Sequence, residues 1–241
     1  MSKTYEAMYK SERALNAPLT ETTASPKLLI KNPENIEQLR NLEQQIALLM
    51  QKNNYKVFHF TGSKEKEGVS NITLNLTRFM SEKKPAKNIL LIDANLNHPV
   101  LHAELNVPAN PGLRDALSGT IPYNECVHKF NSGSITVMPC GKKASDVSDS
   151  IHQDRMSELI AKLKPQYDCV IIDSSPLLES SDSLSLAVAS DVTFLVVQAN
   201  RTQWEVAEKS KLYLEKNGCR LGGVILNRVT HTIPEWIYKR L

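Results

Sequence analysis

Residues 61–71 read Thr61-Gly62-Ser63-Lys64-Glu65-Lys66-Glu67-Gly68-Val69-Ser70-Asn71, between an apolar run at 57–60 and a helix-like run at 72–80. A strand, a loop and a helix in this order are typical of a phosphate-binding loop, in which backbone N–H groups and the helix N-terminus hold phosphate. Gly68 and Ser70 match that loop, but Val69 occupies the place of the lysine that meets the β- and γ-phosphates. The sequence therefore predicts a nucleotide-binding scaffold without its central cation.

The composition is that of an ordinary globular protein. Of its 241 residues, 41% are hydrophobic and 23% are charged, which suits one large α/β domain with extensions. The net charge of +3 without a densely basic segment predicts no nucleic-acid binding. No apolar run approaches the roughly 20 residues that cross a bilayer, and no secretory signal is evident. Four scattered cysteines without CxxC spacing predict free thiols in a cytoplasmic protein.

Strands and helices alternate along most of the chain. Short apolar or β-branched runs predict strands at 57–60, 89–92, 135–138, 169–172, 192–197 and 224–226, and helical patterns lie at 70–82, 150–163 and 202–216. A further helix is predicted from Pro33, with Asn32 as its N-cap. Near-continuous apolar strands separated by helices predict an α/β fold with a doubly wound, mostly parallel sheet flanked by helices on both faces.

Three segments are expected along the chain. Residues 1–27 are predicted to form a short helix (2–16) and a flexible linker (17–27), because the latter is polar, contains proline and has no periodic pattern. Residues 28–230 form the phosphate-loop domain, and residues 231–241 form a C-terminal tail with Tyr238 as its single tyrosine.

Polar side chains follow the predicted strands at their carboxyl ends, where parallel sheets bind ligands. The segment Asp93-Ala94-Asn95-Leu96-Asn97-His98-Pro99 follows one strand, and Asp173-Ser174-Ser175-Pro176 follows another. Asn227 and Arg228 follow the last one. We expect these segments to lie around the loop at 62–71 and to form one site.

With these segments the chain resembles, over residues 30–230, the bacterial tyrosine autokinases of exopolysaccharide synthesis, relatives of the MinD-type P-loop ATPases. The strand that ends in Asp93-Ala94-x-Leu96-x-x-Pro99 resembles the extra Walker motif of this family, and the strand that ends in Ile172-Asp173-Ser174-x-Pro176 resembles its Walker B motif. Gly112-Leu113-x-Asp115-x-Leu117-x-Gly119 lies between them in the expected order.

The chain departs from the family pattern at positions that carry charge. The family has lysine at Val69, aspartate at Asn95 and arginine at Asn97, as well as glycine at Lys66 and threonine at Asn71. Phosphoryl transfer depends mainly on positioning and on stabilising charge, and removing a single electrostatic donor costs on the order of 100-fold or more in rate. The resemblance therefore implies a degenerate, pseudokinase-like member whose catalysis is impaired.

The resemblance also implies roles for individual positions. Nucleotide would contact Gly68, Val69, Ser70, Asn71, Asn227 and Arg228, and Mg²⁺ would be held by Ser70, Asp93 and Asp173. The relic catalytic positions are Asp93, Asn95 and Asp173, and an amide such as Asn95 cannot accept a proton at neutral pH. We expect either no cofactor or weak ATP or ADP binding, with Mg²⁺ only alongside nucleotide.

A partner surface is implied by the ring-forming helix of the family, which carries Glu, Arg and Arg at three-residue spacing. Here Glu37 and Arg40 match, and Glu43 reverses the third charge. Such a reversal weakens self-association or redirects the surface to another protein; alternatively, Glu37 and Arg40 are only a pair on the helix surface. The expected partners are the cytoplasmic segment of a membrane chain-length (co-polymerase) protein, an active kinase paralogue or a second copy, which would place the chain at the inner face of the cell membrane.

An active enzyme is the alternative function. An ATP-dependent autokinase or ATPase would need Lys64, which lies where MinD-type proteins carry a signature lysine, or Lys66 to replace the missing amine. We favour solvated lysines that alternate with Glu65 and Glu67, and Lys66 would need a costly positive φ in place of glycine. A MinD-like positioning protein would need an amphipathic tail with a sustained apolar face, and residues 233–241 are too short and mixed for one.

Overall fold

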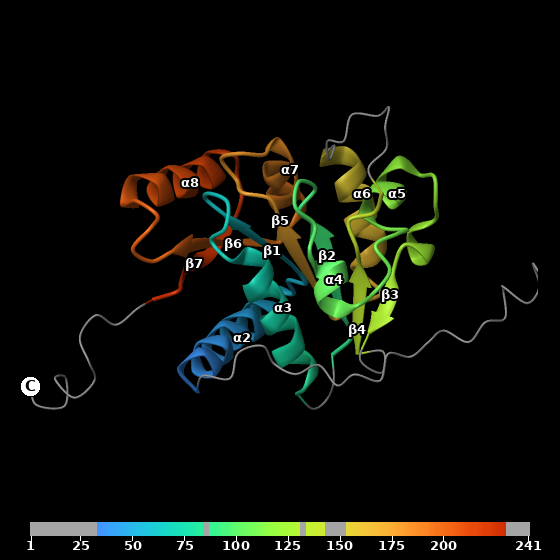
Figure 1. Ribbon diagram of the computed structural model, residues 1–241, viewed down its shortest axis with the longest axis horizontal. Helices are drawn as coiled ribbons and strands as arrows, with labels where there is room; N and C mark the ends of the chain where they lie inside the picture. The colour runs from blue at the N-terminus through green and yellow to red at the C-terminus, as the bar shows by residue number, and fades with distance from the viewer. Residues whose placement is uncertain (1–32, 84–86, 131–133, 143–152, 230–241) are drawn as a thin grey trace, which may run out of the picture.

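The protein is described here by a computed structural model that covers residues 33–83, 87–130, 134–142 and 153–229 (Figure 1). The elements in chain order are α2 (Pro33–Asn53), β1 (Val57–Gly62), α3 (Val69–Ser81), β2 (Ile89–Ala94), α4 (Leu101–Leu105), α5 (Leu113–Ser118), the 3-10 turn η1 (Tyr123–Glu125), β3 (His128–Phe130), β4 (Ile135–Met138), α6 (Gln153–Leu163), β5 (Cys169–Ser174), α7 (Ser181–Ala189), β6 (Val192–Gln198), α8 (Trp204–Lys216) and β7 (Leu221–Asn227).

The strands form one sheet, with the order β3-β4-β2-β5-β1-β6-β7 in the described part of the chain. Every neighbouring pair is parallel except β3 and β4, which run antiparallel at one edge. The register places Asp93 of β2 directly beside Asp173 of β5. The carboxyl ends of β1, β2, β5, β6 and β7 therefore meet along one edge of the sheet, and the predicted doubly wound fold is confirmed.

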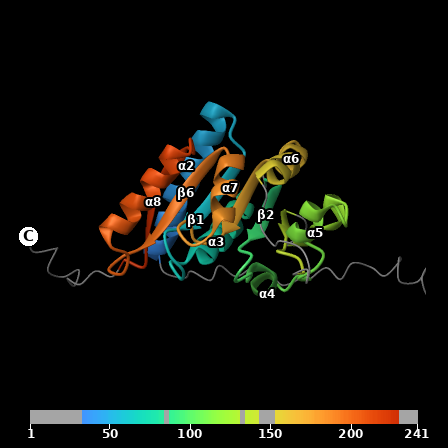
Figure 2. The same cartoon turned by 90° about the horizontal axis from the view of Figure 1, so that it is seen from above.

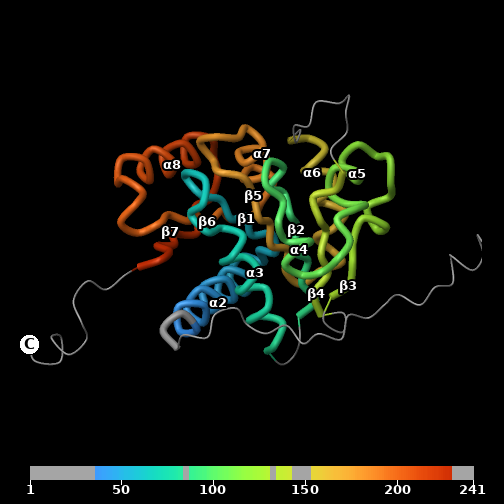
Figure 3. The backbone as a smooth tube through the Cα atoms, viewed as in Figure 1, coloured from blue at the N-terminus to red at the C-terminus, as the bar shows by residue number. Residues whose placement is uncertain are grey.

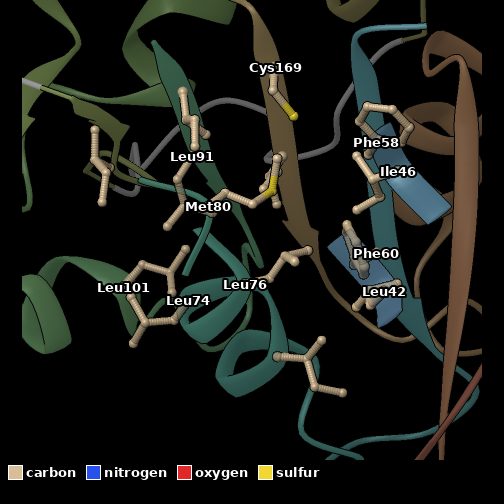
Figure 4. Packing of buried hydrophobic residues seen from close by; sticks show 14 of the residues in the cluster. Leu42, Ile46, Phe58, Phe60, Leu74, Leu76, Met80, Leu91, Leu101 and Cys169 are labelled. Atoms are coloured by element: carbon tan, nitrogen blue, oxygen red, sulfur yellow. The ribbon is translucent and has the colours of Figure 1, made fainter. Parts of the chain in front are cut away.

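Helices cover both faces of the sheet and bury an apolar core on each. On one face, α2, α3 and α4 pack against the sheet, and Phe58 and Phe60 of β1 contact Ile46 of α2 in the same cluster (Figure 4). The Phe60 and Phe194 rings stack with their centroids 5.2 Å apart, which joins β1 to β6. On the other face, α6 contributes Met156, Leu159, Ile160 and Leu163 to a second cluster. Figure 2 shows α8 near the β6 end of the sheet and α5 at the far side.

The structure extends most predicted strands and adds elements that the sequence pattern did not indicate. β1, β2, β5 and β6 run one or two residues beyond their predicted ends, and β7 begins three residues earlier and ends one residue later than predicted. β3 and α4 were not predicted, because β3 spans three residues and α4 five, which is too short for a periodic pattern. The predicted helix and linker in 1–27 and the tail at 231–241 lie outside the described residues.

Two helices are followed by a glycine with a left-handed backbone. Gly119 after α5 and Gly218 after α8 both have a φ of 74°, which is the left-handed conformation of glycine at a helix C-terminus. Within the part of the chain that the structure describes, no helix is long and apolar enough to cross a membrane.

Candidate functional site

The loop between β1 and α3 has the backbone shape of a phosphate-binding loop. Gly68 has a φ of 92°, and a Cβ atom there would lie 2.3 Å from Nδ2 of Asn227, so only glycine fits. Lys66 also adopts a positive φ, 66°, as expected for a residue in the place of a glycine. The loop thus keeps its backbone shape, and the left-handed conformation of Lys66 costs conformational free energy because this residue is not glycine.

Glu67 lies inside this loop with a 1% exposed side chain. Its Oε2 atom accepts hydrogen bonds from the backbone N–H groups of Ser63 (2.5 Å) and Lys64 (3.0 Å). Its Oε1 atom accepts a short hydrogen bond from the hydroxyl group of Thr202, in the connection between β6 and α8. The sequence pattern placed Glu67 only in alternation with the loop lysines and gave no sign that its carboxylate is buried.

Two residues at the end of β7 form hydrogen bonds with the same loop; Figure 3 traces the backbone of both segments. Nδ2 of Asn227 donates to the carbonyl oxygen of Glu67 at 2.8 Å, and Nη1 of Arg228 lies 3.4 Å from the carbonyl oxygen of Lys66. The structure therefore brings these two predicted nucleotide contacts to the loop. Asn71 is exposed on the first turn of α3, where its Oδ1 accepts from Asn75 at 3.2 Å.

The side chain that replaces the lysine packs against the apolar core. Val69 begins α3, and its partly buried side chain packs against the core cluster between α2, α3 and the sheet. Lys64 and Lys66 are both exposed. The loop thus combines a hydrocarbon in the lysine position with a buried carboxylate.

Two buried carboxyl groups, those of Asp93 and Asp173, lie beside the loop at neighbouring strand ends, and both residues are 0% exposed. Asp93 is fully engaged: its oxygens accept the backbone N–H groups of Asn95 (3.2 Å), Val100 (3.1 Å) and Leu101 (3.0 Å). It therefore shapes the connection from β2 to α4. By contrast, neither carboxyl oxygen of Asp173 accepts a well-formed hydrogen bond within the described residues, although the Ser70 hydroxyl group lies close enough to lower its pKa.

Burial raises the pKa of Asp173 well above its ordinary value, the nearby Asp93 carboxylate raises it further, and the Ser70 hydroxyl group opposes the increase. Burial also raises the pKa of Asp93, against the effect of its three N–H donors. A carboxylate with two free oxygens beside a hydroxyl group suits Mg²⁺, which prefers oxygen ligands. Asp173 and Ser70 therefore fit the implied metal, whereas Val69 does not fit the triphosphate that would accompany it.

Asn95, which stands where the family has its second aspartate, links two loops of the site. Its Oδ1 atom accepts from the backbone N–H of His98 at 3.2 Å and from the Ser175 hydroxyl group at 3.0 Å. Nearby, the exposed side chains of His98 and Glu65 approach to 3.3 Å and connect this loop to the phosphate-type loop. The Asn95 amide thus holds the β2 and β5 connections together.

Comparisons with known proteins agree with this geometry. A family model described as an AAA domain matches residues 44–209, more than half of the chain. The chain belongs to the AAA-domain family. Relatives of this AAA-domain chain include the tyrosine-protein kinase ptk of Acinetobacter johnsonii, 25% identical over 206 residues (85% of the chain), and the tyrosine-protein kinase CpsD of Streptococcus agalactiae, 28% identical over 182 residues (75% of the chain and 78% of CpsD). The predicted resemblance to bacterial tyrosine kinases is confirmed.

Solved structures give the same fold. The kinase domain of the Escherichia coli tyrosine kinase ETK superposes with a TM-score of 0.77 at 22% identity and covers 92% of this chain and 89% of that domain. The VpsO kinase domain gives 0.66 at 29% identity (80% and 98% covered), and MinD of Aquifex aeolicus gives 0.60 at 24% identity (77% and 72% covered). The chain spans only about 28% of the length of several curated kinases that it matches, including ptk.

The expected partner surface of this AAA-domain chain divides into two parts. Glu37 and Arg40 are exposed on α2. Glu43 is 5% exposed and forms an ion pair with Lys83 just beyond α3, so its charge is used within the chain. Only the first two residues of the predicted set are thus presented to solvent.

A buried histidine beneath the site was missed by sequence reasoning. His59 of β1 is fully buried, with Nε2 2.7 Å from the Ser174 hydroxyl oxygen and Nδ1 3.2 Å from that of Thr193. Burial lowers the pKa of His59 to about 3, so the ring is neutral at physiological pH. This network fixes the strand ends β1, β5 and β6 relative to one another. One signal in the sequence could have indicated it: a histidine within the otherwise apolar run of β1.

Proposed function

We propose that this chain is a catalytically impaired, tyrosine-autokinase-like protein that acts in exopolysaccharide biosynthesis or export through protein–protein interaction. The observation that carries the proposal is Val69: the residue in the place of the phosphate-binding lysine packs against the core as a hydrocarbon. The carboxylate buried in the same loop is that of Glu67, whose Oε2 atom accepts hydrogen bonds from the backbone N–H groups of Ser63 and Lys64. Carboxylates repel a triphosphate, so the geometry favours a scaffold over a phosphoryl-transfer enzyme.

Weak nucleotide binding is compatible with this proposal. If ATP or ADP enters, Ser70 and Asp173 are the residues that would hold Mg²⁺, because Asp93 already accepts three backbone N–H groups. Bound Mg²⁺ would supply positive charge that offsets the negative charge of the phosphates. Asn227 and Arg228 lie at the loop, where the nucleotide contacts are expected.

The proposed partner is the cytoplasmic segment of a membrane chain-length (co-polymerase) protein or an active kinase paralogue, at the inner face of the cell membrane. Support comes from the relatives, which are tyrosine-protein kinases, and from the exposed charges on α2. Self-association through α2 is disfavoured, because Glu43 replaces the third cation of the family pattern and is occupied by Lys83.

The partner surface is tested by charge reversal on α2. Arg40→Glu is expected to weaken binding to that cytoplasmic segment by about 10-fold or more, because like charges replace a complementary pair. Lys52→Glu, on the same helix and also exposed, is the matched control and is expected to leave affinity within about 2-fold. Biolayer interferometry on immobilised partner segment measures both. Equal losses in the two variants would show that general charge, not this surface, governs binding.

An active enzyme with a displaced lysine is the second candidate, favoured by the free carboxylate of Asp173. It requires Lys64 or Lys66, both exposed, to turn into the loop. We expect radiolabelled phosphate release from ATP to stay at background in the natural chain and in the Lys64→Ala and Lys66→Ala variants. Turnover that one of these alanine variants abolishes would establish the second candidate instead.

A further inference from the structure

The Glu67 carboxylate is held by backbone donors of the loop itself. Two N–H groups of consecutive residues, Ser63 and Lys64, point to one oxygen, and the Thr202 hydroxyl group donates to the other. Backbone N–H groups that converge on an anion are the usual means by which such loops bind phosphate. Here the anion on these donors belongs to the chain itself.

The carboxylate lies next to the altered lysine position. A Cβ atom built on Gly62 would be 2.7 Å from Oε2 of Glu67 and 3.4 Å from Cγ2 of Val69. The side chains of Glu67 and Val69 therefore both lie close to the backbone of Gly62 at the start of the loop. A negative charge placed this close acts on any phosphate group in the loop, because a partly buried site screens charges poorly.

The same residue ties the loop to its neighbours. Through Thr202, the Glu67 carboxylate is joined to the connection between β6 and α8. Through its carbonyl oxygen, Glu67 is joined to Asn227 at the end of β7. The loop is therefore joined by hydrogen bonds to donors from two other segments of the chain.

We propose that Glu67 is the resident anion of this loop: its carboxylate fixes the shape of the loop in place of a bound phosphate, and an external phosphate group must compete with it. Glu67 is thus a positioning residue that keeps the loop in a ligand-independent state. This inference rests on the proposed function and adds to it a reason why the scaffold is stable when no nucleotide is bound.

The test is titration calorimetry of the full chain with inorganic pyrophosphate, without metal. The natural protein is expected to show no saturable binding, and Glu67→Ala is expected to gain affinity by about 10-fold or more over it, because one buried negative charge is gone and two N–H groups are free. Glu65→Ala, which removes an exposed carboxylate from the same loop, is the control and should behave like the natural protein. Pyrophosphate should also raise the melting temperature of Glu67→Ala and leave that of the natural chain unchanged.

Glu67→Gln provides a second measurement if the alanine variant does not fold. It keeps the side-chain shape and one oxygen acceptor but removes the charge, so a smaller gain in pyrophosphate affinity is expected. If neither variant gains affinity or is stabilised by pyrophosphate, the inference is overturned and Glu67 is only a structural link. That outcome leaves the proposed function standing, whereas tight Mg-ATP binding by the natural chain would contradict the proposed function itself.

Discussion

Asp173→Asn is expected to stabilise the protein by about 1–3 kcal/mol at neutral pH, because the charged form of this fully buried carboxyl group lies near Asp93 and is favoured, among the described residues, only by the Ser70 hydroxyl group. For a chain of this size, that corresponds to a rise in melting temperature of roughly 2–12 °C. Thermal and urea unfolding, followed by circular dichroism, measure the change. The physical reason is that a buried charge near Asp93 is replaced by a neutral amide of similar shape.

The pH dependence of this gain follows from the direction of the pKa shift. Asp173 has a folded-state pKa raised above the unfolded value of 3.8, so the folded state binds a proton more strongly than the unfolded state. Its stabilising contribution is present below pH 3.8 and is lost as the pH rises through the folded pKa. The advantage of Asp173→Asn should therefore be smallest near pH 4 and grow towards neutral pH.

Asp154→Asn is the matched control, because Asp154 is exposed in the first turn of α6. Removing its charge should lower stability by at most about 0.5 kcal/mol, through the loss of its favourable interaction with the helix dipole. Destabilisation by Asp173→Asn at pH 7 would contradict the account, since it would mean that the carboxylate has a stabilising partner in the folded protein.

Restoring the lost charges should have the largest effect on activity. Val69→Lys alone is expected to leave ATP turnover within about 3-fold of background, because Asn95 and Asn97 remain where the family has a carboxylate and a guanidinium, and phosphoryl transfer needs them together. In the triple variant Val69→Lys, Asn95→Asp, Asn97→Arg, ATP turnover is expected to rise about 100-fold or more above background. A change of this size in rate is typical of even a single electrostatic group at a reaction centre. Release of ADP from Mg-ATP measures both.

The contacts of Asn95 are the reason why we expect one substitution to be insufficient. The Asn95 amide is hydrogen-bonded to His98 and Ser175, so it holds the loop together but cannot take a proton. Asp173→Ala in the triple-variant background serves as the control and should remove the regained activity. Substantial turnover by Val69→Lys alone would show that the other losses matter little and that the scaffold is closer to an enzyme than we propose.

Much of the fold follows from local patterns. The parallel sheet was predicted because β1, β2, β5 and β6 are near-continuous apolar runs, which only a sheet covered on both faces can bury. The helix from Pro33 was predicted from its capping residues and apolar spacing. The short elements β3 and α4 were not predictable, because three to five residues define no period and long-range packing determines their conformation.

The sequence predicted which residues form the candidate site, but it did not predict which of them contact one another. The absent lysine and the positive φ of Lys66 follow from the loop pattern. The placement of Glu67 does not, because its hydrogen bonds join residues up to 160 positions apart in the chain. The burial of Glu43 against Lys83 escaped sequence reasoning for the same reason: the charge of a side chain does not tell which face of a helix it occupies.

Calorimetric titration of the full, unmodified chain with Mg-ATP and Mg-ADP addresses the main claim most directly. We predict no saturable heat up to millimolar nucleotide, because the loop carries a buried carboxylate and a valine where a triphosphate needs an ammonium group. Saturable, magnesium-dependent binding in the micromolar range, accompanied by hydrolysis, would contradict it and would mean that another amine of the chain reaches the phosphates.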